Sequence, residues 1–207
     1  MPGDEGEHTV NIMLVLAHPA QDSFNYAIAD ECRRTLLRSG HGVWFHDLYG
    51  EGFEPLLRAA EFPRGARLDE TIRRHCDELV SADGIVVVHP NWWGQPPAIL
   101  KGWIDRVFRP GVAYRFDEGD SGEGVPVGLL RAKAAIVFNT GNTPLSREQD
   151  VFGDPLDNLW RNCIFDLCGV TNVKRLLFSV VVTSSREDRK DWLRQACELV
   201  AETFPHV

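Results

Sequence analysis

The feature that most constrains the fold is a set of short apolar runs that hardly alternate with polar residues. Four of them are nearly continuous, and a weaker fifth lies at 43–45: IMLVLA at 12–17, GIVVV at 84–88, AAIVF at 134–138, LLFSVVV at 176–182 and VWF at 43–45. Continuous apolar strands are typical of parallel sheets that are covered by helices on both faces. The sequence therefore predicts a five-stranded parallel sheet between two helical layers.

Stretches with helical spacing of apolar residues separate these runs and follow the last one. They lie at 24–36, 68–79, 99–108, 156–167 and 192–203. Repeated alternation of strand and helix predicts a doubly wound α/β sheet with right-handed crossovers.

Two segments interrupt the alternation. Residues 48–67 contain Gly and Pro and are expected to form an irregular excursion, and the glycine-rich residues 111–131 are expected to form a loop or hairpin. We expect one domain over 1–207, with 1–9 as a flexible tail.

Bulk properties exclude several classes of partner. The formal net charge of −8 argues against nucleic acid or an anionic membrane as the main partner, and no apolar run approaches the ~20 residues of a membrane span. We do not expect the acidic start to be a signal peptide. The five cysteines form no CxxC pair, so we expect buried thiols in a reducing cytoplasm.

Ligands of such sheets bind at the carboxyl ends of the strands, which directs attention to three loops. The first, HPAQDSFN at 18–25, leads into a helix whose N-terminal N–H groups suit a phosphate. Ser23 and Asn25 could add hydrogen bonds. The alternative is that Asp22 or Ser23 only caps the helix. The loop contains no glycine, so it is neither a GxGxxG turn nor a P-loop.

The second loop, at 89–96, places Trp92 and Trp93 side by side before Gly94. Two exposed indoles suggest that something flat covers them, and a planar heteroaromatic ring would do so. Backbone N–H groups beside Gly94 could bind the edge of that ring. The alternative is that the tryptophans fill a dimer contact or cap the core, and both hold if the ligand lies at a subunit interface.

The third loop, NTGNTPLSRE at 139–148, offers Asn139, Thr140 and Asn142 as hydrogen-bond partners and Gly141 for close backbone approach. As an ordinary polar turn it would have no such role. Arg147 and Glu148 could meet a nucleotide phosphate or simply begin a helix.

Three stretches resemble the flavodoxin-like NAD(P)H:quinone oxidoreductase family, which includes DT-diaphorase and shorter bacterial quinone reductases. They are PNWWGQPPAILKGWIDRVFRPGVAY at 90–114, AHPAQDSFNYAI at 17–28 and NTGN at 139–142. The resemblance implies strand order 2-1-3-4-5, helices on both faces and a homodimer. It also implies flavin-binding residues: His18, Ser23, Phe24 and Asn25 at the phosphate, Pro90, Asn91, Trp92, Trp93 and Gly94 along the isoalloxazine, and Thr140, Gly141 and Asn142 on its other side.

The function implied by the resemblance is a ping-pong oxidoreductase that passes a hydride from NAD(P)H to bound flavin and two electrons on to a quinone-like acceptor. The chain lacks the long C-terminal extension of the mammalian members, which favours FMN over FAD. Two alternatives stay open: a flavin-binding regulatory subunit of a potassium efflux system, and a flavodoxin-type electron carrier.

The chain departs from the family at the residues that mammalian members use for proton transfer. No Tyr follows Tyr114, the only later His is His206, and Phe152 takes the place of the family's His. The catalytic residues are therefore unknown. Arg106 is expected on a salt-bridged helix surface or at the dimer contact. His46, His75 and His89 lack ligand spacing, so they are expected in the core or at strand ends, and no metal is predicted.

Overall fold

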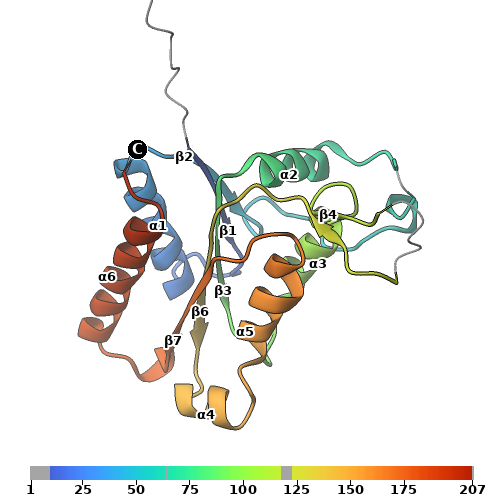
Figure 1. Ribbon diagram of the computed structural model, residues 1–207. Coiled ribbons are helices and arrows are strands. Elements are labelled where there is room, and N and C mark those ends of the chain that lie inside the picture. Colours follow the sequence, from blue (N-terminus) through green and yellow to red (C-terminus); the bar gives the residue numbers. More distant parts are fainter. Residues whose placement is uncertain (1–9, 64, 118–122, 207) are drawn as a thin grey trace, which may run out of the picture.

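Five parallel strands form the central sheet of the computed structural model, which describes residues 10–63, 65–117 and 123–206 (Figure 1). The strands are β1 (Asn11–Leu16), β2 (Gly42–Asp47), β3 (Gly84–Pro90), β6 (Ala135–Gly141) and β7 (Val173–Ser179). Their spatial order, β2-β1-β3-β6-β7, confirms the predicted order 2-1-3-4-5. The prediction of a flexible tail at 1–9 lies outside the described residues.

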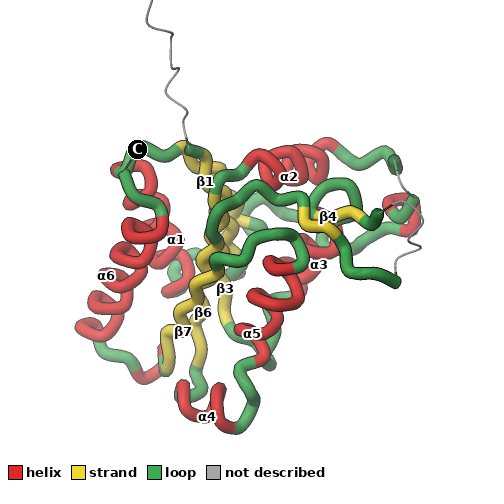
Figure 2. The backbone as a smooth tube through the Cα atoms, in the orientation of Figure 1, coloured by secondary structure: helices red, strands yellow, loops and turns green. Residues whose placement is uncertain are grey.

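Helices cover both faces of the sheet, as the apolar runs predicted (Figure 2). One layer consists of α1 (Phe24–Arg38) and α6 (Arg186–Thr203). The other contains α2 (Glu70–Ser81), α3 (Ala98–Val107), α5 (Pro155–Asn158) and the π-helix (Leu159–Asp166).

The strand side chains alternate between two cores. Met13 and Val15 face the core under α2 and α3, whereas Leu14 and Val86 face the core under α1 and α6. Because both faces of the sheet are buried, most of the sequence of each inner strand is continuously apolar.

Two strands are placed differently from the sequence expectation. The run at 134–138 predicted the start of β6 but not its end, because the strand continues through Asn139 and Thr140 to Gly141. β7 begins at Val173 rather than 176 and ends at Ser179, and residues 181–183 form a 3-10 turn. β7 is an edge strand that pairs only with β6, so it tolerates polar residues that an apolar pattern does not detect.

The two interrupting segments have the predicted character. Residues 111–131 contain an antiparallel pair, β4 (Tyr114–Arg115) and β5 (Val127–Gly128). In the described part of the excursion at 48–67, the only helix or strand is the 3-10 turn Ala59–Glu61.

The excursion explains why the surface placement expected for Arg106 is wrong. Arg106 is 1% exposed, and its Nη2 lies 2.6 Å from Glu61 Oε1 and 2.9 Å from Asp69 Oδ2. The 48–67 segment lies over α3 and supplies Glu61, so the guanidinium is buried but paired.

Two further sequence expectations concern solvent and membrane exposure. All five cysteines are free, but Cys163 is exposed, which contradicts the expectation that the thiols are buried. Among the described residues, no helix combines the length and apolar character that a bilayer span requires.

Candidate functional site

Three loops meet at the carboxyl edge of the sheet, at the end where α4 (Leu145–Asp150) lies in Figure 1. The parallel register places Pro90 opposite Thr140, and Gly141 opposite Ser179. The loops that follow β1, β3 and β6 are therefore neighbours, as the topology predicted.

The tryptophan loop is a tight turn that presents Trp93 to the outside. Trp92 and Gln95 exchange backbone hydrogen bonds of 3.1 and 3.0 Å, and the two residues between them have positive φ, 58° at Trp93 and 72° at Gly94. These are the signs of a type I′ turn. A left-handed conformation costs a residue with a side chain about 1–2 kcal/mol. Trp93 is also fully exposed, at 101%.

The turn uses most of its own amides, which corrects the expectation that several were available for a ligand. The N–H groups of Trp92 and Gln95 bind within the turn, and the N–H of Gly94 donates to Asn91 Oδ1 at 2.9 Å. Within the described chain, only the N–H of Trp93 is left without a partner among residues 92–95. A ring at this turn could meet one backbone donor rather than several.

Two adjoining cavities open between the three loops. The first, here the α1 cavity, has a volume of about 410 Å³, and the second, the turn cavity, about 540 Å³. They share Asn91, Gly141, Asn142 and Thr143 in their walls. Of the residues predicted to bind flavin, Trp93 and Gly94 line the turn cavity and the others line the α1 cavity: His18, Ser23, Phe24, Asn25, Pro90, Asn91, Trp92, Thr140, Gly141 and Asn142.

The α1 cavity is equipped to hold an anion. Ser23 is the N-cap of α1, so the free N–H groups and positive dipole end of this 15-residue helix lie at the cavity. His18 Nδ1 lies 3.1 Å from the Ala20 nitrogen and 3.2 Å from the Ala20 carbonyl oxygen, so these backbone contacts hold the ring at the cavity. Arg189 of α6 also lines the cavity.

The Arg189 guanidinium is oriented by two hydrogen bonds, 2.8 Å to Ser184 Oγ and 3.0 Å to the Val181 carbonyl. Sequence reasoning missed this residue, because it lies far along the chain in a charged, solvent-facing helix. The capping signal at Ser185, which marks the start of α6 after β7, was the one pattern that could have placed it at this edge.

A buried amide gives the α1 cavity an unsatisfied polar group. Asn25 is 3% exposed, and its Nδ2 donates to Thr140 Oγ1 at 2.9 Å. Its Oδ1 is sealed and has no partner. An unpaired buried oxygen is unfavourable unless a ligand donor reaches it.

The turn cavity is lined by flat and apolar groups. Trp93, Phe152 and Pro155 contribute rings, and the Arg147 guanidinium lies 5.1 Å from the centre of the Phe152 ring. Pro155 packs under the turn so closely that a Cβ added at Gly94 would lie 2.8 Å from its Cγ. The structure thus places Phe152 on this cavity wall, and it adds Pro155, which sequence reasoning did not single out.

A buried hydrogen-bond network supports the cavity wall from below. His89 Nε2 accepts from Trp160 Nε1 and from Asn139 Nδ2, each at 2.9 Å, and Arg175 joins Asn139 to Asp154 with bonds of 2.6 and 2.8 Å. Asn139 is fully buried, so it serves this network rather than a ligand.

Burial lowers the pKa of His89 to about 3, with a further contribution from the charge of Arg175 against the opposing hydrogen bond to the Pro90 carbonyl. The ring is neutral at physiological pH. The network can therefore hold Asp154, which precedes Pro155 of the cavity wall, without a buried imidazolium.

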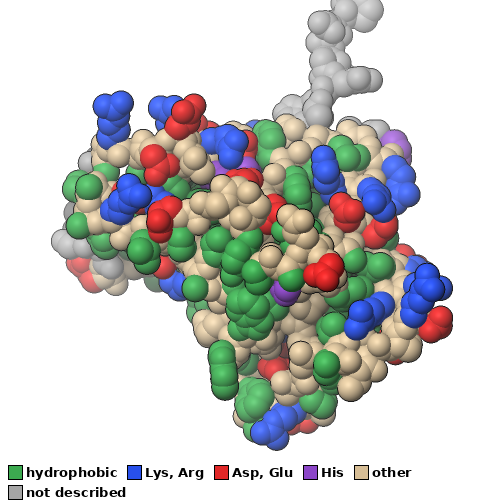
Figure 3. Space-filling model, turned by 180° about the vertical axis from the view of Figure 1, so that it is seen from behind, with side chains coloured by type: hydrophobic (Ala, Val, Ile, Leu, Met, Phe, Trp, Pro, Cys, Tyr) green, Lys and Arg blue, Asp and Glu red, His purple; other side chains and the backbone are tan. Residues whose placement is uncertain are grey.

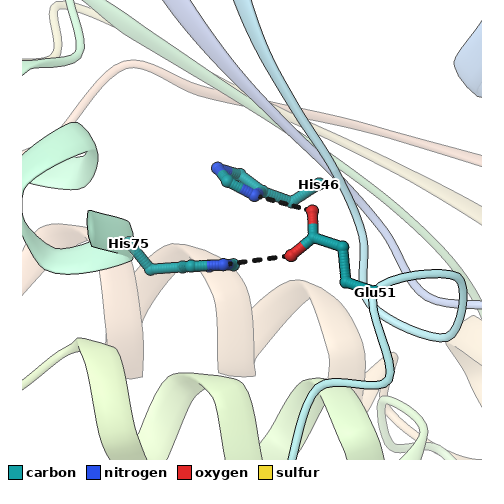
Figure 4. Close-up of side chains that lie close together, drawn as sticks. All are labelled: His46, Glu51 and His75. Atoms are coloured by element: carbon teal, nitrogen blue, oxygen red, sulfur yellow. Dashed lines mark hydrogen bonds and ion pairs between the residues drawn. The ribbon is translucent and has the colours of Figure 1, made fainter. Parts of the chain in front are cut away.

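A second cluster lies away from the cavities and raises the question of a metal (Figure 4). His46, Glu51 and His75 come from β2, the following loop and α2. His46 Nδ1 lies 3.0 Å from Glu51 Oε1, and His75 Nε2 lies 3.2 Å from Glu51 Oε2. Their chain spacing matches no ligand motif, so the sequence did not predict this proximity.

The outer hydrogen bond of His75 argues for a hydrogen-bonded network and against a metal on that ring, whereas His46 Nε2 lies 2.5 Å from Glu78 Oε2 and is compatible with either arrangement. His75 Nδ1 accepts from Trp103 Nε1 at 2.9 Å. An indole only donates, so the proton of His75 lies on Nε2 and points to Glu51. A metal-bound histidine donates through its outer nitrogen, which is the opposite arrangement. Burial raises the pKa of Glu51, but hydrogen bonds from His46 and His75 outweigh it and lower that pKa to about 2.

Comparison with known proteins places the chain among oxidoreductase relatives. A family model described as flavodoxin-like fold matches residues 10–200. A Haemophilus influenzae protein named as an uncharacterized NAD(P)H oxidoreductase is 33% identical over 193 residues, which are 91% of this chain and 93% of that protein. Rattus norvegicus NAD(P)H dehydrogenase [quinone] 1 is 28% identical over 81% of this chain and 68% of its own length.

A solved structure extends the likeness to the whole fold. The FMN-dependent NADH-azoreductase of Bacillus anthracis, in complex with FMN, superposes with a TM-score of 0.75 over 94% of this chain and 99% of its own, at 13% identity. That identity supports the fold alone. With the family match over 10–200, it confirms the resemblance seen in the sequence: the chain belongs to the flavodoxin-like fold family.

Proposed function

We propose that the protein is an NAD(P)H oxidoreductase that binds FMN across the two cavities and reduces a quinone-like acceptor. The balanced reaction is NAD(P)H + H⁺ + quinone → NAD(P)⁺ + hydroquinone. The observation that carries the proposal is the pairing of a cavity equipped for an anion with an adjoining cavity lined by rings. The names of the rat and Haemophilus relatives support the same activity.

The residues present fit a flavin mononucleotide. Ser23, the N–H groups of α1 and Arg189 would hold the phosphate. Trp93 and Gly94 would lie along the ring, with Gly141 and Asn142 between the two cavities.

A bound flavin supplies hydride and two-electron chemistry, and the chain supplies orientation and a dry surface. The Trp93 N–H is the open backbone donor at the turn. Trp93, Phe152 and Pro155 line the turn cavity with rings that would cover one side of a bound flavin. Phe152 cannot donate a proton, so we assign the proton of the product hydroquinone to solvent.

One cavity would serve both substrates in turn. NAD(P)H and the acceptor both need a flat, aromatic surface, and the face of a flavin ring left open in the turn cavity would offer it. Sequential occupation of a single cavity predicts ping-pong kinetics, seen as parallel lines in double-reciprocal plots at several acceptor concentrations.

We further propose that the protein acts as a homodimer in the cytoplasm. Trp93 is fully exposed, and hydrophobic side chains gather in the middle of the face seen from behind (Figure 3). A second copy that covers the turn would remove the exposed Trp93 indole from water. Five free cysteines suit a reducing compartment.

The test is anaerobic reduction of the flavin-reconstituted protein. We expect a yellow protein that bleaches on addition of NADH or NADPH and regains its colour when a quinone is added. Mass analysis of the released cofactor identifies FMN or FAD. Replacement of Arg189 by Ala should weaken flavin retention, whereas Arg194→Ala, at an exposed ion-paired position of the same helix, should not. A protein that stays colourless after reconstitution would contradict the proposal.

A further inference from the structure

Glu148 is a buried carboxylate on the wall of the turn cavity. It lies in α4 and is 5% exposed. Within the part of the chain that the structure describes, no cation or hydrogen-bond donor contacts its carboxylate. Its oxygens are not among the sealed side-chain atoms that lack a partner, so they keep some accessible area. Glu148 lines the turn cavity, and we take the carboxylate to be the part that faces it.

The charges around Glu148 are engaged elsewhere. The guanidinium of the preceding residue, Arg147, lies over the Phe152 ring rather than on the carboxylate. Asp154 donates its backbone N–H to the Glu148 carbonyl at 2.8 Å, which holds the helix against the loop that follows. The carboxylate of Asp154 is paired with Arg175. The backbone is thus held in place while the Glu148 side chain keeps its acceptor capacity free.

A carboxylate in this setting distinguishes ligands by charge. Its lone pairs can accept an N–H or O–H bond, and loss of water around it strengthens its repulsion of a second negative charge. Trp93 and Phe152 on the same wall favour flat rings, and aromatic faces also favour positive charge. Together these groups suit a planar molecule that is neutral or cationic.

We propose that Glu148 is a specificity-determining residue that selects neutral or cationic planar acceptors and rejects anionic ones. This inference rests on the proposed function, because it concerns the acceptor that enters the turn cavity. It narrows the substrate class: unsubstituted or amino-bearing quinones are accepted, and sulfonated or carboxylated rings are disfavoured.

The test compares two naphthoquinones that differ in one charge, 2-methyl-1,4-naphthoquinone and 1,4-naphthoquinone-2-sulfonate. Two readouts are taken on the flavin-reconstituted protein: Kd from quenching of tryptophan fluorescence, and kcat/KM. We expect Glu148→Gln to shift the neutral-to-anionic ratio of both quantities about tenfold toward the sulfonate, because unit charges roughly 6 Å apart at an effective dielectric of about 40 interact by that amount.

Two variants separate a local charge effect from other causes. Glu148→Asp keeps the charge and should keep the wild-type ratio. Asp150→Asn makes the same charge change at an exposed position of the same helix and should leave the ratio unchanged. A ratio that moves less than twofold in Glu148→Gln, or equally in Asp150→Asn, overturns the assignment.

The two proposals fail in different ways. If the chain takes up no flavin and oxidises no NAD(P)H, the proposed function fails, and the Kd ratio measured on the purified protein decides the role of Glu148. If flavin content and NAD(P)H oxidation are intact but the ratio does not respond, only the role of Glu148 is refuted.

Discussion

The buried imidazole of His89 should make stability depend steeply on pH under acid conditions. Its Nε2 faces two donors, the Trp160 indole and the Asn139 amide, each 2.9 Å away. A proton on Nε2 would set N–H groups against one another, and burial with the charge of Arg175 lowers the pKa of His89 from 6.5 to about 3.

The sign and size of the effect follow from this shift. Between pH 6.5 and about 3, the unfolded chain binds a proton at His89 that the folded chain does not, so stability is lost as pH falls. The loss is ~1.36 kcal/mol per pH unit. The full slope applies only well below pH 6.5, where the unfolded histidine is fully protonated. Going from pH 6.5 to pH 5 should therefore cost about 1.6 kcal/mol from this one residue.

The assay is urea unfolding of the wild type and of His89→Gln at half-unit steps from pH 6.5 to 4.5. A glutamine can accept from Trp160 but does not titrate. The variant is expected to be less stable at pH 7, yet its free energy of unfolding should fall with pH less steeply than that of the wild type, by about 1.4 kcal/mol per unit. Two parallel curves, or an NMR titration that places the pKa of His89 near 6.5, would refute the reasoning.

Three further predictions concern the turn and the buried ion pair. Trp93→Ala should raise the Kd for flavin about tenfold or more, yet change the unfolding free energy by less than about 0.5 kcal/mol, because the indole is exposed. Trp192→Ala, at a residue packed on Phe178 and Phe24, should lower the unfolding free energy and leave the Kd for flavin unchanged. Equal flavin retention in the two variants would count against the site. Gly94→Ala should lower the free energy of unfolding by about 1–2 kcal/mol, because φ at this position is 72° and the new Cβ meets Pro155. An unchanged denaturation midpoint would show that the turn adapts. Arg106→Met should cost roughly 3–5 kcal/mol in urea unfolding, since it leaves a buried carboxylate unpaired, and a loss under 1 kcal/mol would mean that the pair contributes little.

Local patterns in the sequence were sufficient to predict the five-stranded parallel sheet and the loops that meet at its carboxyl edge. The runs at 12–17 and 84–88 are apolar because both faces of the inner strands are buried, and this signal needs no knowledge of partners. The apolar pattern was unreliable for strands that are buried on one face only and for strands that contain buried polar residues. Asn139 is polar yet lies within a central strand, since His89 and Arg175 satisfy its amide.

Contacts between distant residues were beyond the reach of the sequence. Arg106 reads as a surface residue of an amphipathic helix until the 48–67 excursion brings Glu61 onto it. His46 and His75 meet only because β2 and α2 are adjacent in the fold. Arg189 reaches the α1 cavity from the last helix of the chain. In each case the side-chain chemistry was visible, but the partner was set by tertiary packing.

The central claim is that one flavin spans the α1 and turn cavities at the carboxyl edge of the sheet. Its most direct test is an equilibrium titration of the purified, flavin-free protein with FMN, followed by the quenching of tryptophan and flavin fluorescence. The account predicts saturation at one FMN per chain, with weaker binding in Ser23→Ala and Trp93→Ala. No saturable binding, or saturation that both substitutions leave unchanged, would contradict it.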